Sequence, residues 1–182
     1  LLSEVRSAEA VMAVRNSISS GHYILSTIHA DKATSIPNRM YSLLETNQDI
    51  AQFLKSIYRY IQIGVYIRGY QDKVTHRFIR EIAEVCEFYV TENNDAKYNV
   101  LYRKTPDGKV TMANPSSYLL DYLEAQGVEL PEHLKNIAGN DKEYAPGVDA
   151  IEEAQNQKSE LEMAFEEENN KEENGDTTSS NN

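Results

Sequence analysis

The sequence lacks several features that would identify a secreted, membrane-spanning or nucleic-acid-binding protein. Its one cysteine, Cys86, excludes an internal disulfide framework and suits a reducing compartment. No apolar run approaches the ~20 residues of a membrane helix, so no membrane insertion is expected. The 18 Lys and Arg residues form no cluster that would indicate direct nucleic-acid binding.

Negative charge is abundant but unevenly placed. The 182 residues carry a net charge of −11, and the stretch from Asp149 onward holds 11 acidic residues and two lysines. Residues 1–148 hold the other 18 acidic residues with 16 basic ones, so they are nearly neutral. The composition beyond Gly139 shifts to Glu, Asn, Ser and Thr, which predicts a largely disordered acidic tail over residues 141–182.

The most informative stretch is Gly-His-Tyr-Ile-Leu-Ser-Thr-Ile-His-Ala at residues 21–30. Residues 23–28 are β-branched, aromatic or aliphatic except for Ser26, which predicts a buried strand with His22 before it and His29 after it. Titratable groups at the carboxyl end of a buried strand lie where open α/β sheets bind ligands. The alternative is that both histidines are loop residues at the ends of a core strand.

A second block opens the sequence. Leu-Leu-Ser-Glu-Val-Arg at residues 1–6 is typical of a buried strand that finishes in a carboxylate, here Glu4. Apolar residues spaced by three and four predict a helix over residues 8–18, and Gly21 suits a left-handed C-cap. The resulting strand, helix and strand are the unit from which parallel sheets are built.

These two blocks in this order resemble the secretion ATPases of type II and type IV systems, which include motors of pilus assembly and DNA conjugation. Residues 1–6 look like the family's Walker B segment, and residues 21–30 look like its histidine box. Residues 77–85, Arg-Phe-Ile-Arg-Glu-Ile-Ala-Glu-Val, resemble a strand of the same family. The resemblance covers residues 1–112, and Ser3 departs from it because the family usually has Gly before the acid.

The resemblance implies an α/β fold: the C-terminal part of a RecA-like P-loop ATPase domain, with a parallel sheet, flanking helices and β-hairpins, over residues 1–112. Short helices are expected over residues 113–140, before the tail. The sequence starts at Leu1 and contains no Gly-x4-Gly-Lys-Ser/Thr loop to cradle the phosphates of ATP. We therefore expect the C-terminal part of a longer protein, inactive alone.

The resemblance also assigns roles to individual residues. Glu4 orients or activates the water that attacks ATP, or holds Mg²⁺ through a water, because acids at this strand end do so in P-loop enzymes. His29 senses the γ-phosphate, and His22 supports the start of the strand. Nucleotide-binding or supporting roles fall to Arg6, Thr27 and Arg39. Arg39 is equally well explained as a solvated arginine.

The implied function is ATP hydrolysis, with ATP and Mg²⁺ as cofactors, to power a secretion, pilus-assembly or conjugative-transfer machine. The implied partners are further copies of the protein in a homohexamer and inner-membrane components of the machine, at the cytoplasmic face of the membrane. Two alternatives involve no catalysis: a catalytically inactive scaffold paralogue with the same fold, and a small α/β interaction module whose histidines are core residues.

Local signals predict the remaining elements. Helices are expected over residues 37–44, 50–58, 118–126 and 132–137, with Asp31 or Thr34 capping the first of them. Residues 61–67 alternate apolar and other residues, which predicts a half-buried strand paired with residues 77–89. A second hairpin is expected from residues 100–103 and 110–112 around a Pro-Asp-Gly turn. Arg68 is expected to pair with Glu81 or Glu84 across the strands.

Overall fold

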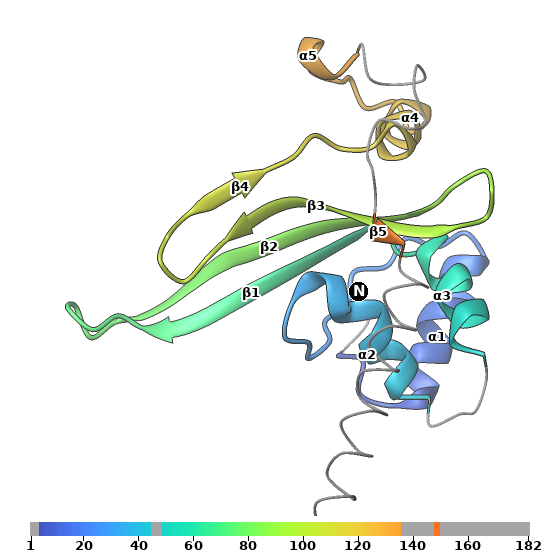
Figure 1. Cartoon of the computed structure of the whole chain (residues 1–182). Helices are drawn as coiled ribbons and strands as arrows, with labels where there is room; N and C mark the ends of the chain where they lie inside the picture. Colours follow the sequence, from blue (N-terminus) through green and yellow to red (C-terminus); the bar gives the residue numbers. More distant parts are fainter. Residues whose placement is uncertain (1–3, 45–48, 136–147, 150–182) are drawn as a thin grey trace, which may run out of the picture.

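An antiparallel sheet runs through the protein and separates two groups of helices (Figure 1). The computed structural model describes residues 4–44, 49–135 and 148–149. The strands are β1 (Ile63–Gln71), β2 (Phe78–Val90), β3 (Ala96–Lys104), β4 (Val110–Met112) and β5 (Val148–Asp149). Their order is β1-β2-β3-β4, and β5 pairs with β3. All four pairings are antiparallel.

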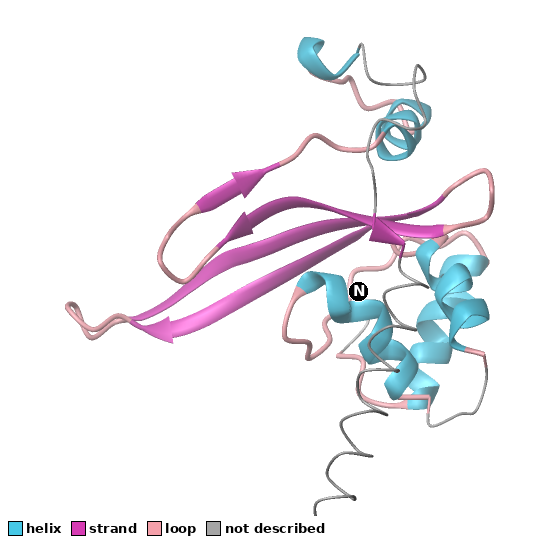
Figure 2. Cartoon of the chain, viewed as in Figure 1, coloured by secondary structure: helices cyan, strands magenta, loops and turns pink. Residues whose placement is uncertain are grey.

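The helices lie on both sides of this sheet (Figure 2). One group comprises α1 (Ala8–Ser19), the 3-10 turn η1 (Ala33–Ser35), α2 (Ile36–Ser42) and α3 (Ile50–Tyr58). The other group comprises α4 (Ser117–Ala125) and α5 (Glu132–Lys135). The predicted mixture of helices and hairpins is therefore present, with boundaries that differ from the expected ones by a few residues.

The helix boundaries follow from capping chemistry. The side chains of Ser7 and Asp49 accept hydrogen bonds from backbone N–H groups in the first turns of α1 and α3. Gly21 follows the end of α1 with φ +87°, and Gly127 follows α4 with φ +78°. A left-handed backbone of this kind favours glycine, and it stops both helices where the sequence predicted.

The main core lies between the first helix group and the sheet. Leu54 and Ile57 of α3 are fully buried, and the rings of Tyr58 and Phe88 meet edge to face with centroids 5.1 Å apart. Full burial of one such side chain stabilises the fold by about 1.5–3 kcal/mol. The buried residues of this cluster are Val5, Val11, Val14, Ala33, Met40, Phe53, Leu54, Ile57, Tyr58, Cys86, Phe88, Ala96 and Tyr98.

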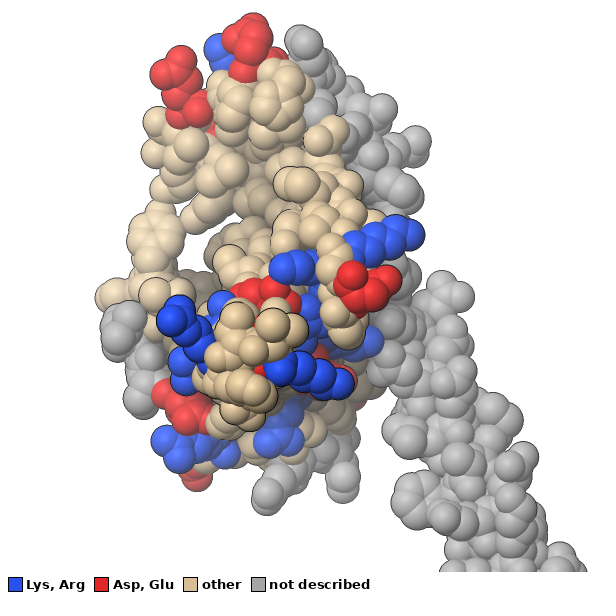
Figure 3. Space-filling model, turned by 90° about the vertical axis from the view of Figure 1, so that its left-hand side faces the viewer, with Lys and Arg blue, Asp and Glu red and all other residues tan. Residues whose placement is uncertain are grey.

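Ion pairs link the outer parts of the hairpins. Glu81 of β2 pairs with both Arg68 of β1 and Lys104 of β3, which confirms the expected cross-strand contact. Arg103 pairs with Glu84 in the same way. Seen from the end of the β1–β2 hairpin, acidic side chains are interleaved with the basic ones (Figure 3).

The expected parallel sheet is not present in the described residues. The segment over residues 23–28 is extended but is not a strand, and its one parallel bridge joins Ile28 to Val5. Tyr23 and Leu25 are 78% and 69% exposed, although the sequence predicted a buried strand. A strand is defined by its neighbours, and here the far side of the segment borders a groove instead of another strand.

The alternation in β1 is also reversed relative to the prediction. Ile63, Val65 and Ile67 are exposed, whereas Gly64 between them is buried. A Cβ at Gly64 would lie 3.0 Å from side-chain atoms of both Ile36 and Phe88. A larger residue would push these two side chains aside, so glycine suits the close approach of β1 to Ile36 of α2, and the isoleucines and valine point away from that side.

Two smaller expectations also fail. Ser35, not Asp31 or Thr34, stands at the N-cap of α2, because η1 precedes that helix. Residues 148–149, expected within the disordered tail, pair with β3 as the short strand β5. The rest of the predicted tail, the strand before Glu4 and the end of the last expected helix lie outside the described residues.

Candidate functional site

Glu4 and His29 converge at one end of two neighbouring extended segments. The backbone N–H of Val5 donates to the carbonyl oxygen of Thr27 at 2.7 Å, and Val5 and Ile28 form the parallel bridge. This pairing brings the residues on either side together, so His29 Nε2 lies 2.9 Å from Glu4 Oε1. The structure thus unites the two residues that the resemblance marks as catalytic.

The carboxylate of Glu4 is held on one side and unsatisfied on the other. Its Oε2 lies 2.9 Å from Arg6 Nε, an ion pair with an arginine whose side chain is 76% exposed. Its buried Oε1 lies 2.9 Å from His29 Nε2, and no other described residue donates a hydrogen bond to it. Buried carboxylate oxygens normally have a partner, so this atom has unused capacity for a water or another donor.

His29 is the accessible member of this pair. Its side chain is 90% exposed, against 24% for Glu4. It borders a shallow hollow of about 560 Å³ beside α2 that Arg39 also lines. Arg39 Nη1 donates to Ser42 Oγ at 3.3 Å within the same helix, so its guanidinium lies at the edge of this hollow. Asp31 lines the same hollow, so the hollow presents charges of both signs.

The structure does not bring His22 or the side chain of Thr27 to this site. His22 is exposed at the opposite end of the segment, where its Nδ1 lies 3.1 Å from Ser20 Oγ. Its backbone N–H donates to the carbonyl of Ser17 at 3.1 Å, which ties it to the end of α1. These contacts place His22 at the start of the segment, and its supporting role stays a prediction. Thr27 contributes its carbonyl to the bridge with Val5, and its side chain is exposed.

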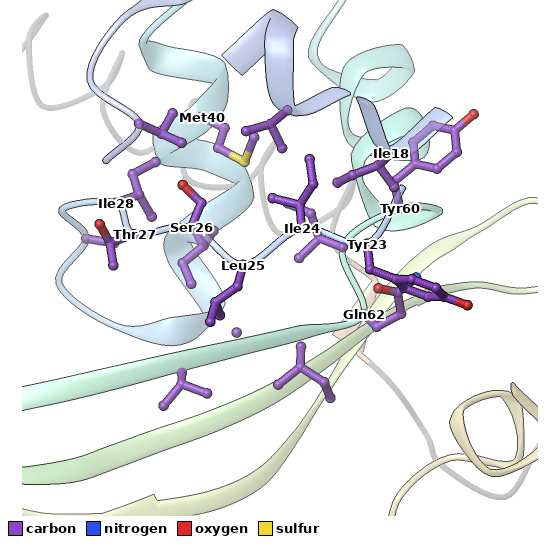
Figure 4. A pocket seen from close by; sticks show the side chains of 18 of the residues that line it. Ile18, Tyr23, Ile24, Leu25, Ser26, Thr27, Ile28, Met40, Tyr60 and Gln62 are labelled. Atoms are coloured by element: carbon purple, nitrogen blue, oxygen red, sulfur yellow. The ribbon is translucent and has the colours of Figure 1, made fainter. Parts of the chain in front are cut away.

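A groove of about 790 Å³ separates the histidine segment from β1 (Figure 4). Its walls come from residues 21–30 on one side and residues 60–67 on the other, and Tyr122 and Gln126 of the α4 region border it. The side chain of Leu25 is directed toward β1. The lining is mostly apolar, and it includes the exposed Leu25 and Val65.

The described residues hold no ready-made metal cage. In residues 4–44, 49–135 and 148–149, no group of three or more His, Cys, Asp or Glu side chains is placed to bind a metal ion. Mg²⁺ in nucleotide sites is usually bound by one or two carboxylates plus phosphates and waters. The unsatisfied oxygen of Glu4 fits that limited role. None of the described helices is long and apolar enough to cross a membrane.

Sequence reasoning missed the roles of Glu87, Asn99 and Gln126, whose polar side chains form contacts around the histidine segment and the sheet. Glu87 is buried in β2 and accepts hydrogen bonds from Asn99 and Ser116, while Gln126 accepts one from the hydroxyl of Tyr23 at 2.6 Å. The signal for Glu87 is an acid inside an apolar strand. The contact between Gln126 and Tyr23 spans 103 residues, and no local pattern indicates it.

Comparisons with known proteins agree with the geometry. A comparison with curated proteins gives no match. The family model described as type II/IV secretion system protein matches residues 1–111, which include Glu4, both histidines, the helices α1 to α3 and most of the sheet. Since this match covers more than half of the chain, the chain belongs to the type II/IV secretion system protein family.

Proposed function

We propose that this chain carries the water-activating and phosphate-sensing part of an ATPase that powers a secretion, pilus-assembly or conjugative-transfer machine. The observation that supports this most directly is the contact between Glu4 and His29 at the end of two parallel-bridged segments. ATPases need a carboxylate that orients the attacking water and a group that meets the γ-phosphate. Here the half-buried Glu4 suits the first task and the exposed His29 the second.

Each neighbouring residue has a defined part in this proposal. Arg6 holds one oxygen of Glu4, which leaves the other to accept a hydrogen bond from the attacking water. Arg39 adds positive charge to the hollow that His29 borders. Thr27 and His22 fix the two ends of the segment through their backbone groups. ATP would supply the γ-phosphoryl group, and the bound Mg²⁺ would partly neutralise the negative charge of the phosphates.

The groove beside Leu25 supports a RecA-like arrangement in the complete site. Residues 22–28 and β1 run along its two sides, and Leu25 is exposed there. An extended apolar segment placed in the groove would cover Leu25 and pair with residues 22–28 to extend a parallel sheet. We infer that a strand leading into a Gly-x4-Gly-Lys-Ser/Thr loop occupies the groove, because ATP cannot be held tightly without such a loop.

The family membership supports the wider assignment. We propose that the complete ATPase assembles as a homohexamer and works at the cytoplasmic face of the membrane, docked on inner-membrane components of the machine.

A second candidate is an inactive scaffold with the same fold. The specific observation in its favour is that residues 1–182 contain no phosphate-binding loop. In that case Glu4 and His29 form only a structural contact. The two proposals differ in what happens when a polypeptide segment with the loop is present, because only the ATPase then turns over ATP.

The deciding experiment uses Glu4→Gln in the complete polypeptide that joins this chain to a phosphate loop. The substitution keeps shape and removes charge and basicity, so hydrolysis should fall about 10²–10⁴-fold while ATP still binds. Glu124→Gln, an exposed acid on α4, is the matched control and should leave turnover unchanged. Normal turnover in Glu4→Gln would refute the role proposed for Glu4, and no turnover in the unmodified polypeptide would refute the ATPase and favour the scaffold.

A further inference from the structure

Helix α4 touches both the sheet and the histidine segment, although it lies beyond residues 1–111, the part that matches the family. We propose that α4 is a clamp that holds residues 22–30 in place. Glu87 anchors the N-terminal end of this helix to the sheet, and Gln126 at its C-terminal end accepts a hydrogen bond from Tyr23. The clamp is a property of the chain itself. Its consequence for catalysis, a correctly placed His29, rests on the proposed function.

The N-terminal end of α4 is fixed to the sheet by a buried carboxylate. Glu87 Oε1 accepts from the backbone N–H of Ser116 at 2.8 Å, and its Oε2 accepts from Ser116 Oγ at 3.0 Å. Asn99 Nδ2 donates to Glu87 Oε1 at 2.8 Å and to the carbonyl of Asn114 at 3.0 Å. Ser116 is also the N-cap of α4, so this network sets where the helix starts.

Apolar packing fixes the direction of the helix. The rings of Tyr118 and Tyr89 stack with centroids 5.2 Å apart and planes inclined by 17°. Leu120 is fully buried, and Leu130, beyond the helix, is 5% exposed. A helix held at its first residue and along one side cannot swing, so the position of its last turn follows from its length.

That last turn meets the histidine segment. Gln126 Oε1 accepts a hydrogen bond from the hydroxyl of Tyr23 at 2.6 Å. The backbone N–H of Gln126 is bonded to the carbonyls of Tyr122 and Leu123, and Gly127 ends the helix, so the residue has a defined place. Burial, and after it a hydrogen bond with Tyr23, raises the pKa of Tyr122.

Contacts at opposite ends hold the histidine segment. Ile28 pairs with Val5 next to His29, and Tyr23 bonds Gln126 next to His22, whose own N–H bonds the carbonyl of Ser17. Between these ends the segment borders the groove and belongs to no ladder. Losing the contact between Tyr23 and Gln126 would loosen the segment without freeing it, and the distance of the His29 imidazole from Glu4 would vary more. The clamp thus positions a proposed catalytic group without touching it.

The test is amide hydrogen exchange on the 182-residue chain with three variants. Tyr23→Phe and Gln126→Ala each remove one partner of the hydrogen bond, and Gln126→Glu keeps an acceptor oxygen at neutral pH. We expect exchange over residues 22–30 to rise about 3–10-fold in the first two variants, as for the loss of one hydrogen bond. Gln126→Glu should stay within twofold of the unmodified chain. Tyr70→Phe, on the distal part of β1, is the matched control.

Three results would overturn the clamp. The first is unchanged exchange over residues 22–30 in both Tyr23→Phe and Gln126→Ala. The second is a rise in exchange in α3 and β2 that equals the rise over residues 22–30. The third is the same rise in exchange over residues 22–30 in Gln126→Glu as in Gln126→Ala. None of these results depends on ATP.

A second experiment tests the consequence for catalysis in the complete polypeptide. Gln126→Ala should lower kcat about 3–10-fold with unchanged KM. If exchange rises but the polypeptide has no ATPase activity, the clamp stands and the proposed function fails.

Discussion

Glu84 joins the loop after His29 to the far strand of the sheet. Its Oε1 accepts a hydrogen bond from the backbone N–H of Thr34 at 3.1 Å, and its Oε2 lies 2.9 Å from Arg103 Nε. Both Glu84 and Thr34 are buried. The carboxylate therefore fixes η1, and with it the chain that leaves His29, against β2 and β3.

The first prediction follows from this contact. Glu84→Ala leaves the N–H of Thr34 buried without an acceptor and removes the partner of Arg103. The free energy of unfolding should fall by about 2–4 kcal/mol, as for other buried polar networks that lose one member. Urea unfolding measures it, with Glu124→Ala as the exposed control that should change it by less than about 0.5 kcal/mol. A loss below about 1 kcal/mol for Glu84→Ala would show that the contact is dispensable.

A pH dependence is expected from Glu87. Burial raises the pKa of this carboxyl above its ordinary 4.5, and the hydrogen bonds from Asn99 and Ser116 oppose that rise only in part. A raised pKa in the folded state means that folding favours the protonated form. The contribution of Glu87 to stability is therefore complete below pH 4.5 and is lost as the pH rises through the folded-state pKa.

The variant Glu87→Gln isolates this effect. Glutamine keeps one carbonyl oxygen for Asn99 and the N–H of Ser116, and its amide donates to Ser116 Oγ, so the contacts survive without the charge. The unmodified chain should lose stability relative to Glu87→Gln as the pH rises above 4.5, until a plateau is reached. Urea unfolding of both proteins from pH 4 to 8 measures the difference, and a difference independent of pH would contradict a raised pKa.

The elements that local chemistry specifies were predictable from the sequence. Ser7 and Asp49 begin helices because their side chains accept from the first turn, and Gly21 and Gly127 end helices because their φ is positive. The second hairpin was equally predictable, since Gly108 in the Pro-Asp-Gly turn has φ +88°. In each case the cause lies within a few residues of the effect.

The parts that failed depend on partners far along the chain. Residues 23–28 have the composition of a buried strand, but a strand needs a run of backbone pairings to a neighbour, and the described residues supply only the single bridge to Val5. Glu84 was predicted only as a cross-strand partner because its other partner, the backbone of Thr34, is 50 residues away. The family resemblance assigned Glu4 and His29 to one catalytic site, but their direct contact was not predicted, since 25 residues separate them.

Another prediction concerns nucleotide binding by the 182-residue chain alone. Without the N–H cradle and lysine of a phosphate loop, Glu4, His29 and Arg39 offer too few contacts to hold ATP. Calorimetric titration with magnesium and ATP should give no affinity in the micromolar range, and no phosphate release should be measurable. Micromolar binding would mean that the hollow beside His29 is itself a phosphate site, and the inferred strand in the groove would be unnecessary.

The last prediction separates the roles of the two histidines in the complete polypeptide. His29→Ala removes the group proposed to meet the γ-phosphate, so turnover should fall about 10–10³-fold, the range of one electrostatic contact to a transition state. Its side chain is 90% exposed, so the melting temperature should change little. His22→Ala removes only the contact with Ser20 at the end of α1, so turnover should fall less.

If both histidines merely stand at the ends of an extended segment, the ordering differs. Each alanine variant would then leave turnover per folded molecule unchanged and lower only the melting temperature. His133→Ala, an exposed histidine on α5, controls for loss of an imidazole elsewhere in the protein. Turnover and melting temperature measured on the same three proteins separate the two cases. Normal specific activity of His29→Ala would exclude a γ-phosphate contact. A large loss of turnover at constant melting temperature would support one.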